Sequence, residues 1–167
     1  MGRTILVAVL AASATLPWGA SPLRGQALTK PVPPLLALSL NELNFGSVLP
    51  GIPSSVPVHD PRNSGLFQVQ GPPGTSVRVE FVLPGALATG GGALLPLNFG
   101  PRDGYADFSR GRPPRGLVFD PHAPVIGALG PNGDLYLRLG GTAVPTRTQP
   151  GGDYRGTIFM TVYDLGI

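Results

Sequence analysis

Hydrophobic and polar side chains alternate with a period of two in many short segments of this chain. The last segment, Asp153–Asp164, is the longest. Successive side chains of a β-strand point to opposite faces, so such a segment has one face of each kind. Its apolar face holds Tyr154, Gly156, Ile158, Met160 and Val162, and its second face holds Arg155, Thr157, Phe159, Thr161 and Tyr163. We therefore predict a C-terminal strand that buries the first face and completes a sheet.

Similar segments recur from residue 36 onward. The clearest is Thr75–Leu83, in which Val77, Val79, Phe81 and Leu83 alternate with Arg78 and Glu80. That pattern is typical of an antiparallel sheet with one solvated face. The other predicted strands are Leu36–Leu40, Leu43–Val48, Ser54–His59, Leu66–Gln70, Ala86–Thr89, Ala93–Phe99, Leu117–Phe119, Val125–Leu129 and Asp134–Leu139, and 142–148 is predicted as a short strand or a loop.

Glycine and proline divide these segments from one another. The chain contains 25 Gly and 21 Pro, and no helical i, i+3, i+4, i+7 pattern survives their spacing. Asn132-Gly133 predicts a hairpin turn, whereas 100–116 is the least organised stretch. Many short strands with one apolar face each favour two packed antiparallel sheets over a barrel. We predict an all-β antiparallel β-sandwich.

The first residues have the composition of an export signal. Arg3 supplies a positive charge, Ile5–Leu16 is apolar, and Gly25-Gln26-Ala27 carries small side chains at the positions that a signal peptidase inspects. The apolar run is shorter than the roughly 20 residues needed to span a bilayer as a helix. We predict a signal peptide over 1–27, a single domain over 28–167, and no transmembrane segment after cleavage. The protein is then periplasmic, at the cell surface or extracellular.

The charge of the chain is small once the leader is set aside. Arg3 and Arg24 lie in the leader, so removing these two charges from the net +3 leaves +1. The segment Arg110–Arg115 carries three arginines and is interpreted as a solvated loop rather than a nucleic-acid site. We expect no nucleic-acid partner.

The side chains that carry chemistry are sparse. There is no cysteine, which excludes thiolate sites and disulfides. His59 next to Asp60, and His122 near Asp120, could each give two metal ligands, but a site needs three or four. A carboxylate pair for glycoside hydrolysis could come from Asp103, Asp107, Asp120 and Asp134, although each lies beside Gly, Pro or a turn. We expect no catalytic residue, no metal site, no cofactor and no enzymatic activity.

Three segments resemble a known family. These segments are Leu43-Asn-Phe-Gly-Ser-Val-Leu-Pro-Gly51, Phe67-Gln-Val-Gln-Gly-Pro-Pro-Gly-Thr-Ser-Val77, and Leu139-Gly-Gly-Thr142 with Gly152-Asp-Tyr-Arg-Gly-Thr-Ile-Phe-Met-Thr-Val-Tyr163. They are similar to motifs of bacterial secreted β-domains related to pilin subunits and spore coat protein U. Within that group, the similarity is greatest to a domain-of-unknown-function family. The resemblance implies an immunoglobulin-like, pilin-like sandwich and a fimbria-like or surface role. The paired cysteines of many pilins are missing, and 100–116 has no counterpart.

The expected function is that of a non-enzymatic secreted or cell-surface structural protein, pilin-like or coat-like, acting through strand-edge contacts with itself or another surface subunit. The alternative is a monomeric extracellular binding module for a carbohydrate or protein ligand. Two candidate contact surfaces follow. Leu36, Leu38 and Leu40 form a row that either inserts into a neighbouring subunit or belongs to the domain's own first strand. Phe159 and Tyr163 mark either a contact surface or ordinary packing.

Overall fold

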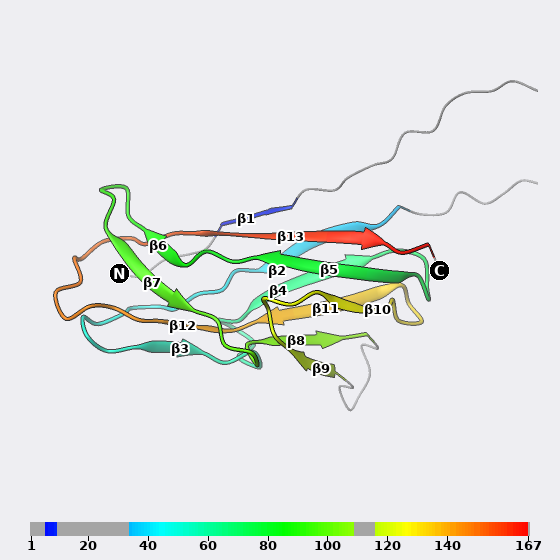
Figure 1. The fold of residues 1–167 in the computed structure, drawn as a ribbon, viewed down its shortest axis with the longest axis horizontal. Helices are drawn as coiled ribbons and strands as arrows, with labels where there is room; N and C mark the ends of the chain where they lie inside the picture. The colour runs from blue at the N-terminus through cyan, green and yellow to red at the C-terminus, as the bar shows by residue number, and fades with distance from the viewer. Residues whose placement is uncertain (1–5, 10–33, 109–115, 167) are drawn as a thin grey trace, which may run out of the picture.

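The computed structural model describes residues 6–9, 34–108 and 116–166 of the 167-residue chain. Within these ranges the chain forms thirteen β-strands and no helix. The strands are arranged in three sheets (Figure 1). All pairings between strands are antiparallel apart from the parallel pair of β1 with β13. The prediction of an all-β, antiparallel fold is confirmed.

The strand order of each sheet mixes segments that are far apart in the sequence. The first sheet has the order β1 (Leu6–Val9), β13 (Thr157–Asp164), β5 (Ser76–Val82) and β10 (Val125–Ala128). The second has the order β2 (Leu36–Asn41), β4 (Gly65–Gln70), β11 (Asp134–Leu139), β8 (Gly104–Asp107) and β9 (Gly116–Phe119). The third has the order β3 (Ser54–Val56), β12 (Gly141–Ala143), β7 (Leu94–Asn98) and β6 (Ala86–Ala88), and lies at the left end of the molecule in Figure 1.

The first two sheets pack face to face around one hydrophobic core. The Phe67 ring of the second sheet meets the Phe81 ring of the first edge-on, with ring centroids 5.4 Å apart. Alternate residues of each strand are fully buried between the sheets: Val77 and Val79 on β5, Ile158 and Met160 on β13, Phe67 and Val69 on β4, and Leu135, Leu137 and Leu139 on β11. This is the period-two burial that two stacked sheets produce.

The terminal strand buries the predicted face but is shorter than predicted. Ile158 and Met160 are completely buried, whereas Phe159 and Tyr163 are exposed. The strand begins at Thr157 instead of Asp153. The reason is a change of partner, because Arg155 forms an isolated bridge with Ala88 of β6, whereas Phe159 onward pairs with β5.

Two other local predictions are wrong. Leu43–Val48 is not a strand, although Leu43 and Phe45 are core residues. The side chain of Asn44 accepts a hydrogen bond from the Gly46 amide at 2.9 Å, and this local turn competes with a sheet ladder. Asn132-Gly133 does form a tight turn, with Gly133 at φ +77°. It is not a hairpin, because it joins β10 of the first sheet to β11 of the second.

β8 lies in the stretch predicted to be irregular, so the sequence pattern does not predict this strand. Its inward positions are the small residues Gly104 and Ala106, so the segment lacks the apolar alternation that marks a strand. The absence of a side chain at Gly104 is required, since a Cβ there would lie 2.6 Å from the Phe119 ring. The Arg110–Arg115 segment, Ile5 at the start of the apolar leader and the cleavage position Ala27 lie outside the described residues.

Candidate interaction surface

The outer face of the first sheet carries one of the two predicted contact surfaces. Phe159 and Tyr163 of β13 are 42% and 47% exposed. The pairing of β13 with β5 places Phe159 opposite Val82 and Tyr163 opposite Arg78. Val82 was not among the predicted contact residues, although the alternation of Thr75–Leu83 places it on the same face as Arg78 and Glu80.

On this outer face, Arg78 lies between Tyr163 of β13 and Ile126 of β10. The guanidinium of Arg78 forms an ion pair with Glu80 and lies 5.9 Å from the centre of the Tyr163 ring. Ile126 of β10, which is also exposed, is paired with Arg78 on the side away from Tyr163. Exposed ion pairs of this kind contribute little to folding. The Tyr163 ring therefore lies beside a cation on an accessible surface.

The leucine row lies on the opposite side of the molecule. β2 pairs with β4 of the same chain, so Leu36–Leu40 is the domain's own strand in this structure. Leu36, Leu38 and Leu40 are 49%, 39% and 49% exposed, and Ala37 is the residue that packs against the core. Because the two sheets stack face to face, the outward leucines of the second sheet and the outward aromatic rings of the first sheet point in opposite directions. They cannot form one patch.

The lateral edge of β13 is a third feature, which the sequence did not reveal. The Leu165 amide donates to the Ser76 carbonyl at 2.9 Å, in the same register as the β13–β5 ladder. Backbone groups alternate in direction along a strand. The N–H and C=O groups of Ile158, Met160 and Val162 therefore point away from β5, toward the edge of the sheet. β1 occupies this edge and also contacts β2 of the second sheet.

Three of the four aspartates considered for catalysis accept hydrogen bonds at turns or between strands. Asp103 Oδ2 accepts from the Gly100 amide at 2.7 Å, and Asp120 Oδ1 accepts from the His122 amide at 2.9 Å. Asp134 Oδ1 accepts from the side-chain amide of Gln68 at 2.8 Å. These contacts are of the kind expected for Asp in turns and at strand ends.

Asp60 shows the same turn-capping role most clearly. Its carboxylate accepts hydrogen bonds from the Asn63 side chain at 2.8 Å and from the Arg62 and Asn63 amides at 2.9 and 3.0 Å. These bonds, that of the Asn63 side chain foremost, lower the pKa of Asp60 below its ordinary value of 3.8. The charged carboxylate is therefore part of the folded turn.

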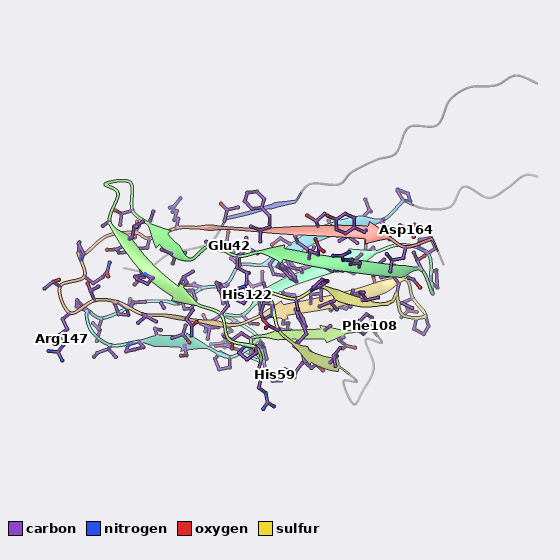
Figure 2. The ribbon with its side chains drawn as sticks, viewed as in Figure 1. Glu42, His59, Phe108, His122, Arg147 and Asp164 are labelled. Atoms are coloured by element: carbon purple, nitrogen blue, oxygen red, sulfur yellow. The ribbon has the colours of Figure 1, made fainter. Side chains whose placement is uncertain are left out.

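The two histidines lie in separate environments (Figure 2). The His59 ring meets the Tyr105 ring edge-on at 4.8 Å, and His122 Nε2 lies 3.2 Å from the Phe99 carbonyl oxygen. Across 6–9, 34–108 and 116–166, no three His, Cys, Asp or Glu side chains gather as metal ligands would. In the same ranges no helix is long and apolar enough to cross a membrane.

A comparison with protein-family models and with curated proteins finds no match to this chain. The sandwich and its surfaces are thus the observations on which a functional proposal can be built.

Proposed function

We propose that this chain is an exported, non-enzymatic structural protein of the pilin-like or coat-like kind, which assembles through the edges of its β-sandwich. The observation that carries the proposal is the pairing of β13 with β1, a segment outside the sandwich domain. A sheet edge that accepts such a strand has free backbone donors and acceptors and no obstacle to pairing. Addition of a strand at such an edge is a general mode of protein association.

An immunoglobulin-like topology is consistent with a local feature near the start of β13. The hydroxyl of Tyr154 donates to the Pro150 carbonyl, four residues upstream, at 2.6 Å. Immunoglobulin-like sandwiches carry a tyrosine near the start of strand F whose hydroxyl bonds back to the chain a few residues upstream, and Tyr154 makes a contact of this kind just before β13. With the resemblance of the segment Gly152–Tyr163 to pilin-related domains and with the predicted leader, this contact supports the assignment to an exported sandwich family.

The composition of β13, which only β1 covers on its outer side, and that of the edge strand β9 also support assembly. Edges of monomeric sheets are usually protected by charges, prolines or bulges. β13 carries neither Lys nor Arg nor Pro between Thr157 and Asp164. At the opposite edge of the second sheet, β9 exposes Leu117 and Val118. Edges with such composition favour pairing with another chain.

The experiment is light scattering coupled to size-exclusion chromatography on the exported protein over a wide range of concentration. We expect oligomers whose mass rises with concentration. The variant Thr161→Lys places a charge in the middle of β13 opposite Glu80, which suits the monomer but hinders a neighbouring strand. We expect it to remain monomeric.

The matched control is Thr148→Lys, the same change in an exposed turn. Thr148 follows Arg147, which Figure 2 places at the end of the molecule away from Asp164. This variant should assemble as the parent does. A parent that is monomeric at every concentration, or a Thr161→Lys variant that assembles normally, would refute the proposal.

The second candidate is a monomeric binding module, and the exposed outer face of the first sheet favours it. Phe159 and Tyr163 present accessible rings on a rigid sheet, which suits contact with a sugar or a protein surface. Glycan-array binding that is lost in the double variant Phe159→Ala, Tyr163→Ala, by a protein that stays monomeric, would establish this candidate. Tyr105 lies on β8 of the second sheet and does not belong to this face.

A further inference from the structure

The segment Leu6–Val9 occupies the same edge that the proposed function uses. It runs parallel to β13, with Leu6 paired to Thr157, Val7 to Ile158, Ala8 to Phe159 and Val9 to Met160. In Figure 1 it lies along the outer side of β13, and it also contacts β2. The same residues belong to the apolar stretch of the predicted export leader.

We infer that Leu6–Val9 is a removable strand that keeps the β13 edge closed in the unprocessed chain, so that removal of the leader makes the edge available to another subunit. The inference rests on the proposed function for the identity of the later partner. It adds the regulation of that site, because one segment serves both as the export signal and as the temporary occupant of the assembly edge.

The backbone geometry supports closure of the edge. The N–H and C=O groups of Ile158 and Met160 point toward β1, as the β13–β5 register requires. Since these residues are paired with Val7 and Val9, the residue between them, Ala8, directs its own backbone groups toward β13. A strand held on the same chain has an advantage over a free partner, because its pairing is intramolecular. Pairing of another chain at this edge should therefore be suppressed while the leader is attached.

The chemistry of removal is the hydrolysis of one peptide bond. Water adds to the carbonyl carbon of Ala27, the C–N bond to Leu28 breaks, and a carboxylate and an amine are released by a peptidase of the export pathway. The released leader then leaves by dilution, since its pairing is no longer intramolecular. The edge that remains would accept an extended apolar segment of another subunit.

The test is hydrogen exchange, read by mass spectrometry, on the full chain produced without export so that the leader is retained. We compare the full chain with Ala8→Pro, which lacks the backbone donor facing β13, and with Ala8→Ser, which keeps it. We expect the amides of Ile158 and Met160, which β1 covers, to exchange at least tenfold faster in Ala8→Pro than in the full chain. Ala8→Ser should match the full chain, and the buried β11 amides should be equally protected in all three proteins. Equal exchange at the β13 edge in all three would overturn the inference.

A second variant removes any dependence on the folding of Ala8→Pro. A site for a specific protease inserted after Ala27 allows one folded sample to be measured before and after the leader is cut. Cutting should release the β13 edge amides from protection and allow oligomers to form. Release of protection without oligomers at any concentration would support the closing strand and refute the assembly role. Oligomers of equal size before and after cutting would refute the closing strand and leave the assembly role standing.

Discussion

The hydroxyl of Tyr154 offers a sharp test of what fixes the entry of the chain into β13. The residue is only 6% exposed. Its hydroxyl donates to the Pro150 carbonyl at 2.6 Å and accepts from the side-chain amide of Gln149, also at 2.6 Å. The same Gln149 amide donates to the Leu94 carbonyl at 3.0 Å. One phenol group thus links the start of β13 to the preceding turn and, through Gln149, to β7.

The substitution Tyr154→Phe keeps the ring and removes both hydrogen bonds of the hydroxyl. Each bond has a net value of about 0.5–1.5 kcal/mol, so we expect the free energy of unfolding to fall by about 2 kcal/mol. With a urea m-value of about 2 kcal/mol/M for a domain of this size, the midpoint should fall by about 1 M at an unchanged slope. Urea titration followed by far-UV circular dichroism measures both quantities.

The matched control is Tyr163→Phe on the exposed face of β13, which should change the free energy of unfolding by less than about 0.5 kcal/mol. A double-mutant cycle with Gln149→Leu then isolates the Tyr154–Gln149 contact, with an expected coupling above about 0.5 kcal/mol. If Tyr154→Phe unfolds at the same urea concentration as the parent, the hydroxyl does not hold this corner. Equal losses at Tyr154 and Tyr163 would likewise refute the reasoning.

Two further predictions concern turns. Gly133 has φ +77° and a Cβ there would lie 2.0 Å from the Gly71 carbonyl oxygen, whereas Gly92 at φ +84° has no neighbour within 4 Å. Gly92→Ala should lose only the backbone strain of about 1–2 kcal/mol, whereas Gly133→Ala should also suffer the clash. Thermal denaturation should therefore show a clearly lower melting temperature for Gly133→Ala than for Gly92→Ala. Similar melting temperatures would contradict the clash. Because the folded pKa of Asp60 is lowered, its carboxylate contributes stability that is complete above 3.8 and is lost as the pH falls through the folded pKa. The parent should be more stable than Asp60→Asn near neutral pH, with the gap closing in acid, and a gap that is independent of pH would refute this role.

The proposed function and the further inference both concern the edge of β13. The backbone groups of Ile158, Met160 and Val162 need partners, and a free edge of this composition invites pairing with any extended chain. Under the two proposals, a strand of the leader covers the edge in the unprocessed chain, and a strand of another subunit covers it after the leader is removed. Both proposals therefore depend on the same row of backbone groups and can be tested on the same amides.

Much of the fold could be predicted from local patterns. The alternation around Val77 and Val79, and that around Ile158 and Met160, identified strands and their buried faces, because burial in a two-layer sheet has the same period as the strand itself. Alternation also placed Phe159 and Tyr163 on the face opposite Ile158 and Met160, but it left open whether that face is packed, and only the structure shows that both residues are exposed. The pattern could not identify β8, whose inner positions are glycine and alanine, since small residues leave no hydrophobic signal.

The sequence by itself determined the strand class of the chain and the inward face of its longest strands. Only the tertiary structure decided which strands are neighbours. The tertiary structure places the leucines of β2 and the aromatic rings of β13 on opposite surfaces. It also shows that the Asn132-Gly133 turn connects a strand of the first sheet to a strand of the second. In addition, it shows that Leu6–Val9, which is far away in the sequence, pairs with the edge of β13. The physical reason is that side-chain period is a property of each strand alone, whereas pairing depends on backbone hydrogen bonds that are identical for every sequence.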